Sequence, residues 1–237
     1  MDTKLLYWND AYAKTAKAVV IAVGIDWIEF DQTLFYPEGG GQPSDAGTIS
    51  WNGGSAAVAV VKKEQGTIKH YVKGDVPIVG EQVIMEIDWN RRYALMRMHA
   101  SQHLLSALVL DLFGASTVGN QIGIEKSRID FHPCGFTPEQ LGTLKEKFDQ
   151  AVLEARPITH YEAGRKEVLE KVKPARRRLF ERLPESIERI RVAVIEGYDE
   201  CPCGGTHAGN TKEIGKLRIL GVENKGKDKE RITYTLV

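Results

Sequence analysis

One long helix is expected at residues 90–113, where the sequence reads NRRYALMRMHASQHLLSALVLDLF. The segment contains neither glycine nor proline, and its apolar residues recur three and four positions apart, as they do on one face of a helix. Asp88 or Asn90 is suited to cap the first turn, and Gly114 is suited to end the last one. The pattern of the chain changes at this helix, with strands and turns before it and mixed elements after it.

The residues before this helix have the pattern of short strands separated by turns. Residues 39–45 read Gly-Gly-Gly-Gln-Pro-Ser-Asp and form a loop, because glycine and proline interrupt regular elements. Short strands at regular spacing indicate a small barrel or sandwich, and we expect a β-barrel-like domain over residues 1–89. The strands are expected at residues 18–31, 33–36, 48–51, 56–61, 67–72 and 82–88.

The residues from 90 to 237 form the second expected domain, which mixes helices with an antiparallel sheet. Thr137 and Gln140 have the spacing of a capping box around Pro138, so a second helix begins there and continues to about residue 155. The fold class is therefore α+β. Strands are expected at residues 157–163, 189–195, 217–222 and 231–237, with a charged hairpin loop at residues 225–230.

The composition is that of an ordinary globular protein. The chain has 237 residues, of which 42% are apolar and 27% are charged, and this suits one or two folded domains. No apolar run approaches the roughly 20 residues of a membrane helix, and no apolar signal segment follows the first residues. We therefore expect a cytoplasmic protein without a membrane partner. Three cysteines cannot form a disulfide framework, so metal binding is the better explanation for a close pair of them.

The net charge of zero conceals a difference between the two parts of the chain. Residues 1–90 contain 7 basic and 12 acidic residues, whereas the remainder contains 25 basic and 20 acidic ones. Residues 160–191 alone contain ten basic and six acidic residues, a cluster suited to bind phosphates without sequence specificity. A solvated helix face, on which glutamates pair with the basic residues, is the alternative explanation. Three consecutive arginines stand at the centre of the cluster: Arg176, Arg177 and Arg178.

Two pairs of residues have the spacing of metal ligands. His99 and His103 are four apart on the expected helix, so both imidazoles project from one face. Cys203 and His207 have the same spacing in a glycine-containing segment that can fold tightly. One thiolate with three imidazoles is a plausible tetrahedral set for one Zn²⁺ per chain. A buried thiol and ordinary helix or turn histidines are the alternative explanation.

Other motifs with similar residues do not fit. A zinc protease requires glutamate directly after the first histidine of its helix motif, and Ala100 stands there. The glycine-rich segment at residues 39–41 is not followed by a lysine and does not read as a strand-to-helix turn, so it is no nucleotide-binding fingerprint. Cys134 stands apart from the other cysteines and is expected to be a small core residue.

Three motifs follow one another along the chain. The first is the segment TLFYPEGGGQ at residues 33–42, the second is the helical histidine pair, and the third is Cys-Gly-Gly-Thr-His at residues 203–207. In this order they resemble the editing domain of alanyl-tRNA synthetase and its free-standing relatives, the AlaX family. Further similar residues at 8–10 and 210–215 extend the resemblance over nearly the whole chain. The chain is similar to the medium-length members, which keep the N-terminal glycine-rich domain.

This resemblance implies hydrolysis of the ester in mischarged tRNA. An alanine-specific synthetic site discriminates poorly against other small side chains, so a second site must remove the errors. The family clears Ser-tRNA(Ala), and its longer members are expected to clear Gly-tRNA(Ala), while Ala-tRNA(Ala) is spared. The implied partner is tRNA(Ala) charged with serine or glycine. Whether the protein is a monomer or a homodimer stays open.

Particular residues are expected to have roles in this reaction. Catalysis at a site with four protein ligands needs a fifth position or one ligand that releases the metal. His207 is the ligand expected to do so and then to act as a base near its ordinary pKa of about 6.5. Thr33 and Gln42 are expected to line the amino-acid pocket as further catalytic residues, although the Thr33 hydroxyl could instead be satisfied by the backbone. The glycine-rich segment lets the backbone approach the terminal adenosine or the amino acid. These glycines are Gly39, Gly40 and Gly41.

Contacts with the tRNA are expected from basic residues outside the central arginine cluster as well. Arg97, together with Arg91 and Arg92, flanks the histidine pair and is expected to meet the acceptor end. Lysines and an arginine at residues 225–231 are expected to form a second contact.

Two other functional classes remain compatible with the same residues. A zinc-stabilised nucleic-acid-binding module without catalysis is favoured by a closed set of four ligands, because such sites are usually structural. A metallohydrolase of small esters or amides is the other class. Two features argue against such a hydrolase: the basic second part of the chain, and the absence of a metalloprotease glutamate after His99.

Overall fold

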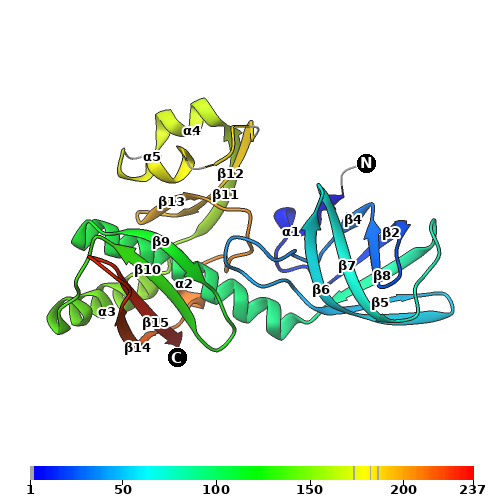
Figure 1. Ribbon diagram of the computed structural model, residues 1–237, viewed down its shortest axis with the longest axis horizontal. Helices are drawn as coiled ribbons and strands as arrows, with labels where there is room; N and C mark the ends of the chain where they lie inside the picture. Colours follow the sequence, from blue (N-terminus) through cyan, green and yellow to red (C-terminus); the bar gives the residue numbers. More distant parts are fainter. Residues whose placement is uncertain (1–2, 173, 182, 186) are drawn as a thin grey trace. The chain divides into compact units, whose positions relative to one another are not determined.

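The computed structural model describes residues 3–172, 174–181, 183–185 and 187–237. The chain divides into two compact units, Met1–Leu95 and Met96–Val237. Helix α2 (Trp89–Phe113) contributes its first residues to unit 1 and the remainder to unit 2 (Figure 1). Among the described residues, no helix is long and apolar enough to cross a membrane.

Unit 1 is a closed antiparallel barrel with the strand order β2-β3-β7-β6-β5-β8, which confirms the expected barrel and the α+β class. Alternation along β8 shows how the barrel is filled, because Val83, Met85 and Ile87 are buried while the residues between them are exposed. The barrel strands are β2 (Thr15–Val23), β3 (Trp27–Phe30), β5 (Gly47–Trp51), β6 (Gly54–Glu64), β7 (Thr67–Gly74) and β8 (Gln82–Ile87).

The segment before the glycine-rich loop differs from expectation. Residues 18–31 form a hairpin rather than one continuous element, with the Gly24 amide bonded to the Trp27 carbonyl at 2.8 Å. The strand expected at residues 33–36 is confined to β4 (Gln32–Thr33), which pairs in parallel with β1 (Lys4–Leu5) before the short helix α1 (Leu6–Asn9). Residues 34–36 are buried one after another, so they cannot follow the alternation of a half-exposed strand.

His70 is enclosed in the barrel of unit 1, and its partners among the described residues are uncharged. Its Nδ1 lies 3.1 Å from the Ile28 carbonyl, and its Nε2 lies 2.8 Å from the Thr33 hydroxyl. Because a carbonyl only accepts, Nδ1 donates and Nε2 of the neutral ring accepts from Thr33. Burial lowers the pKa of His70 to about 4.

We expect unit 1 to lose stability as the pH falls through the window between about 6.5 and 4. In this window the imidazole of the unfolded chain binds a proton that the buried His70 does not. Lowering the pH from 7 to 5 therefore lowers the free energy of unfolding by about 2 kcal/mol. All four tryptophans lie in unit 1, so their fluorescence during urea unfolding reports this unit in the full chain. A His70→Gln variant should lack this pH dependence, and an unchanged slope in it would contradict the assignment to His70.

Unit 2 contains two antiparallel sheets beside α2 (Figure 1). One sheet has the order β14-β15-β10-β9, and the other has the order β11-β12-β13. The four-stranded sheet consists of β9 (Ser116–Gln121), β10 (Ser127–His132), β14 (Leu217–Asn224) and β15 (Glu230–Leu236), and the three-stranded sheet consists of β11 (Ile158–Gly164), β12 (Arg189–Ile195) and β13 (Asp199–Pro202). The helices after α2 are α3 (Pro138–Leu153), α4 (Arg165–Lys171), α5 (Pro174–Glu181) and the short 3₁₀ helix η1 (Thr211–Glu213).

The local signals for α3 and for the last hairpin are confirmed. Thr137 and Gln140 form the capping box, with the Thr137 hydroxyl accepting from the Gln140 amide at 3.2 Å. The helix ends at Leu153, slightly before the expected position, and Ala155 adopts a positive φ of 54°. Strands β14 and β15 are joined by the expected charged loop. Strands β9, β10 and β13 lack a clear alternating pattern and were not predicted.

The three-stranded sheet of unit 2 has one apolar and one polar face. Alternate residues of β11 and β12, including Ala163, Ile190 and Val192, pack with α4 and α5 in a separate core. The opposite face carries His160 of β11, which pairs in register with Ala193, and Cys201 of β13, which pairs with Ala193 from the other side. His160 and Cys201 therefore lie on the same face of the sheet, on either side of Ala193.

Candidate metal centre

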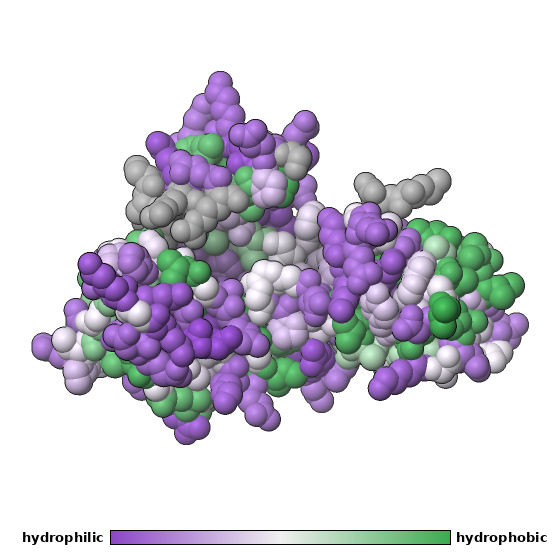
Figure 2. Space-filling model, in the orientation of Figure 1, coloured by the Kyte–Doolittle hydropathy of each residue, from purple (hydrophilic) through white to green (hydrophobic). Residues whose placement is uncertain are grey.

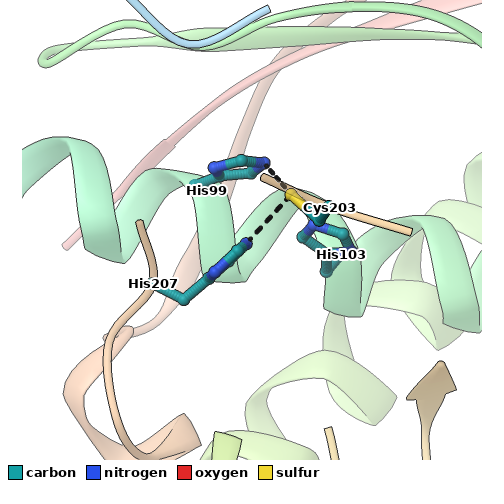
Figure 3. Close-up of side chains that lie close together, drawn as sticks. All are labelled: His99, His103, Cys203 and His207. Carbon is teal, nitrogen blue, oxygen red and sulfur yellow. Dashed lines mark hydrogen bonds between the residues drawn. The ribbon is translucent and has the colours of Figure 1, made fainter. Parts of the chain in front are cut away.

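Four side chains from distant parts of unit 2 converge on one point. His99 and His103 project from α2, whereas Cys203 and His207 come from the loop that follows β13 (Figure 3). The ligand atoms of the four residues lie within 4.8 Å of one another. The Cys203 Sγ is 3.4 Å from the His99 Nε2 and 3.5 Å from the His207 Nε2. The structure thus brings together the four residues that the spacing selected.

The chemistry of this cluster fits a zinc ion. His99, His103 and His207 are 2%, 5% and 2% exposed. The His103 Nε2 is buried and has no hydrogen-bond partner among the described residues, which is costly unless an ion occupies that position. Burial alone raises the pKa of Cys203, but the charge of His99 and the neighbouring imidazoles outweighs burial and holds this pKa well below its usual value. A thiolate with three imidazoles is a donor set for tetrahedral Zn²⁺.

Two further side chains orient the imidazoles of the cluster. The Asp199 Oδ2 accepts from the His103 Nδ1 at 3.0 Å, and the His160 Nε2 lies 2.9 Å from the His207 Nδ1. In both histidines Nε2 is therefore the ring atom left for a metal. Burial, reinforced by the positive charge of Arg191, lowers the pKa of His160 to about 4.

Arg191 holds the loop that carries Cys203 and His207. Its guanidinium donates to the Cys203 carbonyl at 2.8 Å and to the Gly205 carbonyl at 3.0 Å, and the Cys203 amide donates back to the Arg191 carbonyl at 3.0 Å. The side chain itself is 8% exposed. Sequence reasoning missed Arg191, Asp199 and His160, although a metal-bound histidine generally requires a partner for its second nitrogen.

The glycine-rich segment of unit 1 is a tight two-residue turn. Gly39 and Gln42 exchange backbone hydrogen bonds of 3.0 and 2.9 Å, and the residues between them have φ values of +58° and +86°. Positive φ at both central positions favours Asn-Gly, Asp-Gly or Gly-Gly, and Gly40 and Gly41 are such a pair. All three glycines are exposed, so their backbone is accessible to a ligand.

The two expected pocket residues in this unit are buried. Gln42 is 2% exposed, and Thr33 is fully buried. Besides its bond to His70, the Thr33 hydroxyl accepts from the Phe35 amide at 3.0 Å. These contacts give Thr33 a structural role at the beginning of the segment that leads to the glycine-rich turn, and its role in catalysis stays a prediction.

The arginines around the histidine pair have internal partners. Arg92 is buried, is ion-paired with Asp45 and donates to the Leu34 carbonyl at 2.6 Å, so the expectation that it meets the acceptor end is wrong. Arg91 donates to the Ser44 carbonyl at 2.8 Å. Arg97 donates to the Glu213 and Ile214 carbonyls at 2.8 and 2.9 Å, and its contact with tRNA stays a prediction.

Of the three consecutive arginines, the structure describes one side chain. Arg177 is exposed on α5, whereas the side chains of Arg176 and Arg178 lie outside the part that the structure describes. Cys134 is partly exposed and donates to the Phe131 carbonyl at 3.2 Å, so the expectation of a core thiol is wrong.

Comparison with known proteins points to one family. Residues 8–91 match the model of class II (A) tRNA synthetases, and residues 190–233 match the second additional domain of threonyl and alanyl tRNA synthetases. The alanyl-tRNA editing protein AlaX-M of Methanosarcina barkeri is 36% identical over 242 residues, which cover 99% of both chains.

Other relatives agree with this match. The AlaX-M protein of Pyrococcus horikoshii is 34% identical, with 99% of this chain and 98% of the relative covered. The alanine–tRNA ligase of Pyrobaculum calidifontis is 37% identical over 98% of this chain but over only 27% of its own length. The chain therefore belongs to the AlaX-M family of alanyl-tRNA editing proteins.

Proposed function

We propose that this protein deacylates tRNA(Ala) that carries serine, and also glycine, while it spares Ala-tRNA(Ala). The observation that carries the proposal is the convergence of His99, His103, Cys203 and His207, with a buried Nε2 on His103 that has no hydrogen-bond partner in the described part of the chain. Membership of a family whose members are named alanyl-tRNA editing proteins supports the substrate class. A small alanine pocket needs such a second sieve because binding discriminates poorly between small side chains.

The four residues would hold one Zn²⁺ through Cys203 Sγ and the imidazole Nε2 atoms. Bound zinc would supply a Lewis acid that polarises the ester or lowers the pKa of a water. Arg191 would keep the Cys203 loop in place through its bonds to two carbonyls. The Nδ1 of His207 is engaged by His160, so Nε2 is the atom through which His207 would bind the ion or take a proton.

Residues of unit 1 would select the substrate. The exposed backbone of Gly39, Gly40 and Gly41 would approach the amino acid or the terminal adenosine. Gln42 would line the pocket, and Thr33 would contribute by fixing the segment that leads to the turn. For serine, a polar group that hydrogen-bonds to the hydroxyl is left unpaired by alanine, and such sites discriminate by roughly 10⁴-fold or more. This contrast applies to serine and not to glycine, which also lacks the hydroxyl.

Side-by-side release of labelled amino acid from Ser-tRNA(Ala), Gly-tRNA(Ala) and Ala-tRNA(Ala) tests the substrate assignment. We expect rapid loss of serine, measurable loss of glycine and negligible loss of alanine. Equal rates of serine and alanine release would contradict the proposed selectivity for mischarged tRNA. Binding of tRNA without cleavage of any ester would favour the non-catalytic module.

The tRNA contact is proposed to include Arg176, Arg177 and Arg178. Figure 2 shows a further hydrophilic surface over β9, β10 and β15. Arg128 of β10 and Lys126, just before β10, are exposed. Phosphate contacts are weakened by salt because binding releases counterions.

Simultaneous replacement of the three arginines by glutamine should raise the KM for Ser-tRNA(Ala) at moderate salt. The slope of log affinity against log salt concentration should decrease in magnitude by about one for each phosphate contact that is lost. The measurement is kcat/KM at several salt concentrations, with the exposed Lys17, Lys63 and Lys73 replaced by glutamine as a control that removes the same net charge. An unchanged salt dependence would place the tRNA elsewhere and would be compatible with a hydrolase of small esters.

A further inference from the structure

His160 lies next to the four-residue cluster, but it comes from a different element of the fold than the four residues do. It stands in the middle of β11, in a row with Ala193 of β12 and Cys201 of β13. Its Nε2 is 2.9 Å from the Nδ1 of His207, and the two ring centroids are 5.0 Å apart. The contact therefore links the three-stranded sheet to a loop 47 residues further along the chain.

The tautomers of both rings follow from this geometry. The Nε2 of His207 faces Cys203 at 3.5 Å, so this nitrogen carries the lone pair that would bind an ion. The Nδ1 of His207 then carries the proton and donates it to the Nε2 of His160. Such a bond fixes both the tautomer and the rotation of a ligating ring.

His103 and His207 differ in the chemistry of their outer partners. His103 donates to the carboxylate of Asp199, which is 7% exposed, whereas His207 donates to an imidazole. An imidazole acceptor orients the ring without adding a negative charge behind it.

We propose that His160 is a positioning residue that fixes the Nε2 of His207 toward Cys203 and thereby sets the affinity and geometry of the metal centre. The inference rests on the proposed function, because it assumes that the four-residue cluster binds Zn²⁺. His160 itself is not proposed to contact the ion or the substrate.

His160→Phe and His160→Gln separate this role from simple packing. Phenylalanine keeps a ring but removes the acceptor, whereas the glutamine amide oxygen reaches about as far as Nε2 and can accept. We expect His160→Phe to weaken Zn²⁺ binding by about 10- to 100-fold, as for other outer partners of ligating histidines, and His160→Gln to restore most of the affinity. The same two substitutions at the exposed His132 of β10 serve as matched controls and should leave Zn²⁺ binding unchanged.

The readouts are competition for Zn²⁺ against a chromophoric chelator and the absorption spectrum of the Co²⁺-substituted protein. The Co²⁺ bands of His160→Phe should shift relative to those of the unchanged protein, because they report ligand geometry. In a His207→Ala background, His160→Phe should change the Zn²⁺ affinity by no more than a factor of about two, because its effect passes through His207.

The outcomes distinguish this inference from the proposed function. If the unchanged protein binds Zn²⁺ and His160→Phe binds it equally well, the positioning role is overturned while the metal centre stands. An equal loss of affinity with and without His207 would also overturn it. If the unchanged, folded protein binds no Zn²⁺, the metal centre and this inference both fail.

Discussion

Replacement of Cys203 by serine is expected to lower the Zn²⁺ affinity by more than about 100-fold, because removal of an outer partner alone costs about 10- to 100-fold. The thiolate lies 3.4 Å and 3.5 Å from two imidazole nitrogens, and it is the anionic member of the four-residue cluster. Serine keeps the size of the side chain but stays protonated at neutral pH. Release of serine from Ser-tRNA(Ala), measured without added zinc, should fall with the metal content.

The matched control is Cys134→Ser. Cys134 is a partly exposed thiol that lies outside the four-residue cluster. Zinc content and deacylation should stay unchanged in this variant. If Cys203→Ser retained full metal content, the four-residue cluster would not be the metal centre.

Asp45→Asn is expected to destabilise unit 1 by about 3–5 kcal/mol, because it leaves the buried guanidinium of Arg92 without its counter-charge. The side chains of Arg92 and Asp45 are 0% and 1% exposed. Arg92 Nε lies 2.9 Å from Asp45 Oδ1, and Asp45 Oδ2 also accepts from the Tyr36 amide at 2.7 Å. The pair therefore ties the base of the glycine-rich loop to the first turn of α2.

Urea unfolding followed by tryptophan fluorescence measures this change in the full chain, since all four tryptophans lie in unit 1. Asp75→Asn is the matched control, because Asp75 is exposed in the same unit, and it should change the stability by no more than about 0.5 kcal/mol. A loss below about 1 kcal/mol for Asp45→Asn would contradict the assigned role of the pair.

Local signals in the sequence predicted the parts of the fold that short-range physics determines. The helix at residues 90–113 lacks breakers, and the capping box at Thr137 and Gln140 is a contact within one turn. The metal cluster was predictable for the same reason, because each of its two pairs lies within a few residues of sequence. The chemistry of the two pairs suggested one shared zinc site, and the structure brings the pairs together.

Features that depend on pairing between distant residues could not be predicted. Strand β10 has a weak pattern of its own, but it pairs with β15 about a hundred residues later, with Ser127 opposite Tyr234. Burial of Arg92 depends on Asp45, which is 47 positions earlier. The outer partners Asp199 and His160 reach the cluster only because β11, β12 and β13 form one sheet.

The most direct test of the central claim is deacylation of Ser-tRNA(Ala) before chelation, after chelation and after Zn²⁺ is returned, with Ala-tRNA(Ala) in parallel. Far-UV circular dichroism would verify that the chelated protein stays folded. We predict that serine release disappears on chelation and returns with one Zn²⁺ per chain, whereas Ala-tRNA(Ala) remains intact throughout. Undiminished serine release by the folded, metal-free protein would contradict the account.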